Sequence, residues 1–105
     1  MAPRIRKKST QPQADEIIQI GLRLKASRTA LGMTAKDLCM ILGTQPNTFS
    51  QWETGARTPA WYVMVKYSRI YQVSMDWIYA GNPVGMDGEL LRKILLQWAQ
   101  QNEEE

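Results

Sequence analysis

The chain has 105 residues, 44% hydrophobic and 22% charged with a net charge of +3, which is the composition of one small folded domain with tails. Because it has no histidine, a single cysteine (Cys39), no Gly-rich phosphate loop and no HExxH or GxSxG motif, we expect no enzyme, no catalytic residue, no cofactor and no metal site. It also lacks a signal-peptide pattern and any apolar run near the roughly 18 residues that span a membrane, so we expect a cytoplasmic protein without a membrane partner.

The first 14 residues form a polar, proline-containing segment that we expect to be disordered. Residues 20–80 carry seven basic and three acidic residues, whereas residues 81–105 carry two basic and five acidic ones. A basic arm and body favour a polyanionic partner such as nucleic acid, although a solvated charged tail also explains the arm. The basic residues of the arm are Arg4, Arg6, Lys7 and Lys8.

Helical periodicity begins at Asp15 and predicts a first helix that stops at residues 31–32. A second helix is predicted over residues 35–42, with Thr34 as its N-cap and Gly43 as its C-terminal glycine. The apolar residues expected on the inner face of this second helix are Leu38, Ile41 and Leu42.

The third predicted helix begins at Pro46, because proline fits the first helical position, and it ends at Thr54 before Gly55. A fourth helix is predicted over residues 60–71, with its branched and aromatic residues buried, and a short fifth helix over 75–80. A sixth segment, 87–101, carries an amphipathic stripe. Strand signals are nearly absent, so we expect an all-α fold. The stripe consists of Leu90, Leu91, Ile94, Leu95, Leu96 and Trp98.

The second and third helices are joined by a tight glycine turn, and this pattern predicts a helix-turn-helix. Phe49 and Trp52, three residues apart, are expected to face the core together with residues of the second helix. The opposite face of the third helix then carries only small neutral hydrogen-bonding groups, which suit base edges in a DNA major groove, where an amide bonds adenine at N6 and N7. These outward residues are Gln45, Asn47, Thr48, Ser50 and Gln51.

The stretch "LRLKASRTALGMTAKDLCMILGTQPNTFSQWETGARTPA" resembles the Cro/repressor-type (XRE) helix-turn-helix family of phage repressors. The resemblance covers residues 17–82 and includes "VSMDWIYAGNP", which is similar to the closing motif of the family. It implies a five-helix, lambda-repressor-like DNA-binding domain whose third helix lies in the major groove. With the extra C-terminal helix, the expected divisions are a basic arm (1–14), the DNA-binding domain (15–82), and an amphipathic helix with an acidic tail (83–105).

The resemblance also implies roles for individual residues. Arg28 and Glu53 match the buried ion pair of the family, which would hold the recognition helix against the scaffold. Base contacts are implied for Gln45, Asn47, Gln51 and, as a base or phosphate contact, Thr48. Backbone contacts are expected at Ser50, Thr54 and Arg57, and along the arm at Arg4, Arg6, Lys7 and Lys8.

Two positions depart from the family pattern. Ala35 stands where many members carry a phosphate-binding glutamine, and Pro46 stands at a base-reading position and offers only apolar contact. The operator therefore does not follow from that of a relative. Two alternatives stay open: the arm either enters the minor groove or is a mobile tail, and Cys39 either packs at the helix crossing or acts as a redox sensor.

We expect a bacterial or phage-encoded, nucleoid-associated repressor that binds a palindromic DNA operator as a homodimer, without a small-molecule ligand. The alternative is the antitoxin of a toxin–antitoxin pair, which binds a toxin and represses its own operon. A protein-contact adaptor is a third possibility, which the amide-rich face disfavours. The last helix either packs on its own domain, forms the homodimer contact or meets another partner. The residues expected at the dimer contact are Leu90, Leu91, Ile94, Leu95 and Trp98.

Overall fold

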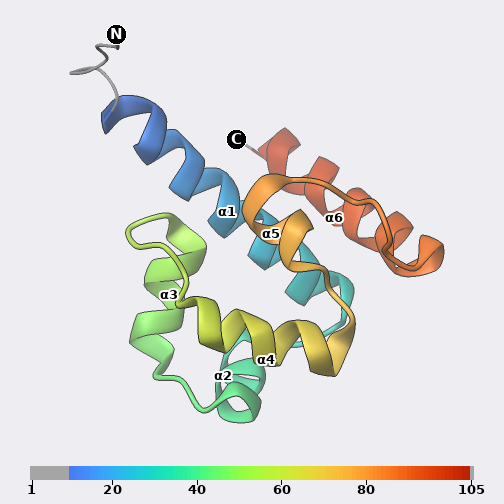
Figure 1. Cartoon of the computed structure of the whole chain (residues 1–105), viewed down its shortest axis with the longest axis horizontal. Helices are drawn as coiled ribbons and strands as arrows, with labels where there is room; N and C mark the ends of the chain where they lie inside the picture. The colour runs from blue at the N-terminus through green and yellow to red at the C-terminus, as the bar shows by residue number, and fades with distance from the viewer. Residues whose placement is uncertain (1–9, 105) are drawn as a thin grey trace, which may run out of the picture.

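The computed structural model describes residues 10–104, and within that range the chain forms six helices and no strand (Figure 1). This arrangement confirms the predicted all-α fold with an additional C-terminal helix. The expected arm residues Arg4, Arg6, Lys7 and Lys8 lie outside the described residues. The helices are α1 (Thr10–Ala30), α2 (Ala35–Leu42), α3 (Pro46–Thr54), α4 (Trp61–Tyr71), α5 (Met75–Ala80) and α6 (Gly88–Glu104).

Helix α1 begins at Thr10, earlier than the start predicted at Asp15. The difference arises at Pro12, since a proline in a polar segment favours a prediction of disorder. In the first turn of a helix, however, a proline is tolerated, because the N–H that it lacks would have no partner within the helix. Residues 10–14 are therefore helical, and α1 projects beyond the other helices at its N-terminal end (Figure 1).

The capping residues correctly predict where the short helices begin and end. Thr34 Oγ1 accepts a hydrogen bond from the Asp37 N–H at 3.1 Å, and Ser74 Oγ accepts one from the Trp77 N–H at the same distance. Gly43 follows α2 with a φ of 72°, a left-handed conformation that glycine adopts without a steric penalty. Thr34 and Gly43 thus define where α2 begins and ends.

Helix α1 is the central element of the core, since it packs against α3, α5 and α6, while α2 packs against α3 and α4. Two predictions about aliphatic residues of the core are wrong. Ile41 on α2 and Ile70 on α4 are exposed, because their helices turn Cys39 and Tyr67 inward instead. The buried apolar side chains are Ile20, Leu24, Ala26, Leu38, Cys39, Leu42, Phe49, Trp52, Met64, Tyr67, Val73, Trp77, Ile78 and Ile94.

Helix α6 packs along α1 on its own domain (Figure 1). Ile94 is completely buried, and the Trp98 ring meets the Trp77 ring edge to face with centroids 6.3 Å apart. Gln101 Nε2 donates a hydrogen bond to the carbonyl of Leu22 at 3.1 Å, which fixes the last turns of α6. The side chain of Ile94 is therefore not available for the dimer contact that was expected of it from the sequence.

The other residues expected at that contact divide between the two sides of α6. Leu90 and Trp98 pack against the core, and Leu91 is half-buried. Leu95 is 46% exposed, and its neighbour Leu96 is 54% exposed. The apolar stripe thus covers α1 with one edge and leaves Leu95 and Leu96 on the outer surface of the domain.

Candidate nucleic-acid interface

Helices α2 and α3 form the helix-turn-helix unit, with residues 43–45 as the turn. The N–H groups of Gly43 and Thr44 both donate to the carbonyl of Cys39, at 2.8 and 3.0 Å, and so close the end of α2. Phe49 and Trp52 are buried beneath α3, with ring centroids 5.9 Å apart. Their burial orients α3 so that its opposite side faces away from the core.

The outward side of α3 is polar and uncharged over most of its length. Gln45, Asn47 and Ser50 are exposed, whereas Thr48 and Gln51 are half-buried. Between Pro46 and Trp52 the helix contains no ionisable residue. The amide and hydroxyl groups on this side provide hydrogen-bond donors and acceptors for base edges. They carry no positive charge, which would attract the DNA backbone whatever its sequence.

An ion pair joins α1 to the end of α3. Arg28 Nε donates to Glu53 Oε2 at 2.8 Å and Arg28 Nη2 donates to Glu53 Oε1 at 3.0 Å, so the pair is bidentate. Both side chains are only 11% exposed, and the hydrogen bond to Glu53 raises the pKa of Arg28. Arg28 Nη1 also donates to the carbonyl of Met33 at 2.9 Å. The same guanidinium therefore links α1, α3 and the segment before α2.

Glycine permits a close approach between α1 and the C-terminal end of α3. A Cβ placed on Gly21 would lie 2.7 Å from the carbonyl oxygen of Glu53 and closer still to that of Trp52. A Cβ on Gly55, just after α3, would lie 2.7 Å from Ile18 Cγ1. The Gly21 contacts involve backbone oxygens, and the Gly55 contact includes Ile18 Cα at 2.8 Å, so α1 sets the position of the recognition helix as well as its orientation.

The loop from Gly55 to Ala60 folds back on α3. The N–H groups of Ala56 and Arg57 donate to the carbonyl of Gln51 at 2.9 and 3.1 Å. Thr54 and Arg57, two of the residues expected to contact the DNA backbone, are exposed here. The Thr54 hydroxyl also donates weakly to the Gln51 carbonyl, at 3.4 Å. The loop thus places a cation at the C-terminal end of an otherwise neutral recognition face.

Two aromatic residues that the periodicity assigned to the core are on the surface. Trp61 and Tyr62, the first residues of α4, are 68% and 65% exposed and meet edge to face with centroids 5.7 Å apart. Met64 and Tyr67 fill the core in their place. The pair stands in the first turn of α4, directly after the 55–60 loop that follows α3. Sequence periodicity missed it because α4 carries apolar and aromatic residues on more than one side, so the pattern does not show which of them face the core.

The N-termini of α3 and α4 differ from those of the other helices whose capping the structure describes. Thr34, Ser74 and Asp87 each accept a hydrogen bond at the start of α2, α5 and α6. The residues in the corresponding positions before α3 and α4, Gln45 and Ala60, make no side-chain cap. Pro46 has no N–H, so α3 presents the N–H groups of Asn47 and Thr48 without a side-chain cap, and α4 presents those of Trp61 and Tyr62. Such uncapped N–H groups can bind water or an anion such as a phosphate.

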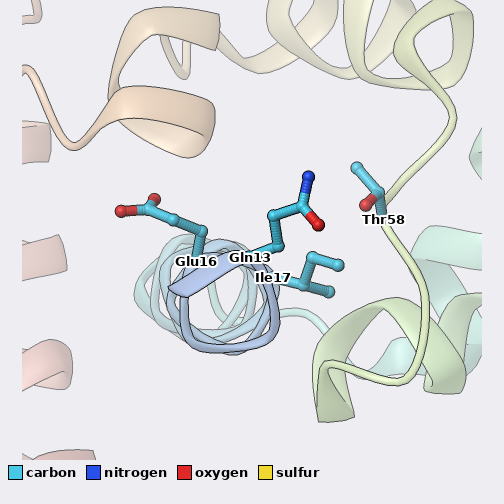
Figure 2. Close-up of a pocket in the computed structure, with 4 residues that line it drawn as sticks. All are labelled: Gln13, Glu16, Ile17 and Thr58. Carbon is cyan, nitrogen blue, oxygen red and sulfur yellow. The ribbon is translucent and has the colours of Figure 1, made fainter. Parts of the chain in front are cut away.

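A shallow groove of about 450 Å³ separates the projecting end of α1 from the α3–α4 loop. Figure 2 shows Gln13 and Ile17 extending from α1 on the side of Thr58, while Glu16 extends to the other side of the groove. Among the described residues that line the groove none is a cation, and the carboxylate of Glu16 would repel a phosphate.

Cys39 is 2% exposed, and burial raises the pKa of its thiol. Both effects lower the reactivity that a redox sensor needs, so the position favours the packing interpretation of Cys39. Within residues 10–104 no three potential metal ligands are grouped together, and no helix is long and apolar enough to cross a membrane.

Comparisons with known proteins agree with this geometry. A family model described as a helix-turn-helix domain matches residues 19–76. The HTH-type transcriptional regulator ImmR of Bacillus subtilis (strain 168) is 30% identical over 90 residues, which cover 84% of this chain and 71% of that protein. No solved structure matches the chain. The family match spans more than half of the chain, including the complete α2–turn–α3 unit, and the chain therefore belongs to the XRE-type helix-turn-helix family of DNA-binding transcriptional regulators.

Proposed function

We propose that this protein is a sequence-specific, double-stranded DNA-binding repressor of bacterial or phage origin. The observation that carries the proposal is the outward side of α3, which offers amides and hydroxyls and is held against α1 by the Arg28–Glu53 pair. A rigidly held helix with neutral polar groups fits the major groove, where bases are read by hydrogen bonds. Repression would follow from occupying an operator that overlaps a promoter.

The proposed contacts fall into two groups. Bases are read by the outward amides and hydroxyl, and the sugar–phosphate backbone is held by residues around them. The uncapped N–H groups at the start of α3 and α4, and the exposed Trp61–Tyr62 pair in the first turn of α4, support a contact with the DNA backbone. The base-reading residues are Gln45, Asn47, Thr48 and Gln51. The backbone-contacting residues are Ser50, Thr54, Arg57 and, in the arm, Arg4, Arg6, Lys7 and Lys8.

We further propose that the protein binds a palindromic operator as a homodimer. One recognition helix spans too few base pairs to single out a site, and a dimer reads two half-sites about 34–36 Å apart. Because α6 packs on α1 and buries Ile94, we place the proposed dimer contact on the exposed side of α6. Leu95 and Leu96 are neighbouring exposed leucines on this helix, and they give the proposed contact its apolar centre.

The antitoxin alternative uses the same outer surface of α6 for a different partner. Leu95 and Leu96 would then contact a toxin, while the helix-turn-helix represses the operon that encodes both proteins. A monomer in solution that forms a stable complex with the product of an adjacent gene would favour this alternative over the homodimer.

Selection of bound sites from random duplex DNA tests the proposal. We expect the intact chain to enrich one motif with twofold symmetry and a half-site spacing of one helical turn. Enrichment of a single non-repeated motif would contradict the homodimer but not the repressor function. Recovery of random sequences at all salt concentrations would contradict sequence-specific binding itself.

A further inference from the structure

Arg57 and Gln51 are linked by backbone and by side-chain contacts. The Arg57 N–H donates to the Gln51 carbonyl at 3.1 Å, and the adjacent Ala56 N–H donates to the same oxygen at 2.9 Å. Arg57 Nη1 also donates to Gln51 Oε1 at 3.5 Å. The side-chain contact is long for a hydrogen bond, and the two backbone bonds hold the backbone of Arg57 next to that of Gln51, within reach of this contact.

This contact gives the Gln51 carboxamide a direction. An isolated glutamine offers an oxygen acceptor and an NH₂ donor, and the two groups exchange places when the side chain rotates. Arginine has only donors, so it selects the oxygen. With Oε1 turned toward Arg57, the group left for a base is the Nε2 donor pair.

The bases differ in what they offer to a donor. Guanine presents two acceptors, N7 and O6, on its major-groove edge, whereas adenine presents the N7 acceptor beside the N6 donor. A free glutamine matches adenine, because it donates to N7 and accepts from N6. When the oxygen is turned toward Arg57, the carboxamide presents its Nε2 donors to the base in place of an oxygen and a donor side by side, although the oxygen keeps a second lone pair. Two donors match guanine.

We propose that Arg57 is a positioning residue that orients the Gln51 carboxamide and makes Gln51 a reader of guanine instead of adenine. The inference rests on the proposed function, because it concerns which base the α3 surface selects. It replaces, for Gln51 alone, the adenine contact expected from glutamine in general. The remaining N–H groups of Arg57 are free to contact a phosphate at the same time, since its fork has five donors.

The charges around Arg57 are compatible with this role. Within the described residues, neither of the two ion pairs involves Arg57, because Glu53 is paired with Arg28 and Glu89 with Arg92. Gln51 is half-buried and Arg57 is exposed, so substituting either side chain leaves the core intact. Substituting Arg57 should therefore change recognition without changing the fold.

The test measures the affinity of the protein and its variants for four operators that differ only at the base pair read by Gln51. That base pair is identified as the one at which Gln51→Ala loses discrimination. The proteins are the full-length chain, Arg57→Ala, Arg57→Lys, and Asn47→Ala as a control on the same helix. Circular dichroism and thermal unfolding of each variant establish that the fold is retained.

We expect the unchanged protein to prefer guanine by about 5- to 150-fold, the range of a good bidentate base contact. Arg57→Ala should shift the preference toward adenine at this position alone, and Arg57→Lys should keep part of the preference for guanine. Asn47→Ala should change discrimination at a different base pair. In addition, a double substitution of Gln51 and Arg57 should discriminate no worse at this position than Gln51→Ala.

Two results would overturn the inference while the proposed function stands. One is a preference for adenine by the unchanged protein. The other is an equal reduction in the affinity of Arg57→Ala for all four operators, with a salt dependence flatter by about 0.9 in log K against log salt, which is the effect of removing one phosphate-binding cation. If no operator is selected at all, the proposed function fails, and the inference fails with it.

Discussion

Arg28 and Glu53 lie 25 positions apart in the chain and form a bidentate ion pair in which each side chain is only 11% exposed. The pair joins α1 to the last turn of α3, next to the point where Gly21 lets the two helices meet. The orientation of the recognition helix is thus determined by a helix that carries none of the proposed base-reading residues. Changes in α1 should accordingly affect DNA recognition.

Breaking the ion pair from one side should destabilise the fold strongly. Glu53→Leu leaves the Arg28 guanidinium shielded from water without a carboxylate to balance its charge, and we expect a loss of about 3–5 kcal/mol in the free energy of unfolding. Urea denaturation followed by circular dichroism measures it. Because a buried pair can often be replaced by apolar residues, Arg28→Met combined with Glu53→Leu should recover much of the loss. If the single substitution costs less than about 1 kcal/mol, the pair does not hold α3.

A methyl group at Gly21 should separate α1 from α3. Since Gly21→Ala places a Cβ against the backbone oxygens of Trp52 and Glu53, we expect a loss of about 1–3 kcal/mol from overpacking and a weaker affinity for the operator. Gly88→Ala in the first turn of α6 is the matched control, because nothing lies within 4 Å of its added Cβ. Equal thermal stability of the two variants would contradict the close approach.

The two sides of α6 should behave differently on substitution. Leu95→Ser with Leu96→Ser should reduce self-association, measured by sedimentation, and leave the unfolding free energy nearly unchanged, since both side chains are about half exposed. Ile94→Ala should instead cost about 2–5 kcal/mol, because it opens a cavity in the core. A dimer that survives the double serine substitution has its interface elsewhere.

Removal of residues 1–8 tests the basic arm. If its four cations neutralise phosphates, deletion should flatten the plot of log K against log salt by about 0.9 for each phosphate that the shortened chain no longer neutralises. Titration of one operator at several salt concentrations, with intact and shortened chains, measures the slope. An identical slope for the two proteins would remove Arg4, Arg6, Lys7 and Lys8 from the interface.

Local chemistry predicted the helix-turn-helix correctly. Thr34, Gly43, Pro46 and Gly55 mark the ends of α2 and α3 through backbone preferences that depend on a few neighbouring residues. The burial of Phe49 and Trp52 likewise follows from their spacing of three within one helix. These features need no knowledge of the rest of the chain, so they are readable from the sequence.

Long-range contacts were not readable in the same way. Arg23 Nε donates to the carbonyl of Ile78 at 2.9 Å near the end of α5, and the Ser27 hydroxyl lies 2.6 Å from that of Tyr67 in the core. Their partners are 40 or more positions apart, and helical periodicity contains no information about which helices meet. For the same reason, the apolar stripe on α6 did not predict that α6 packs against α1.

The amide of Asn47 provides the most direct test of the central claim that the outward side of α3 reads bases. Affinity of the full-length chain and of Asn47→Ala is measured on a selected operator and on random duplex DNA at one salt concentration. We expect a loss of about 1–3 kcal/mol on the operator and little change on random DNA, because Asn47 is exposed and uncharged. An equal loss on both DNAs would contradict base reading by this helix.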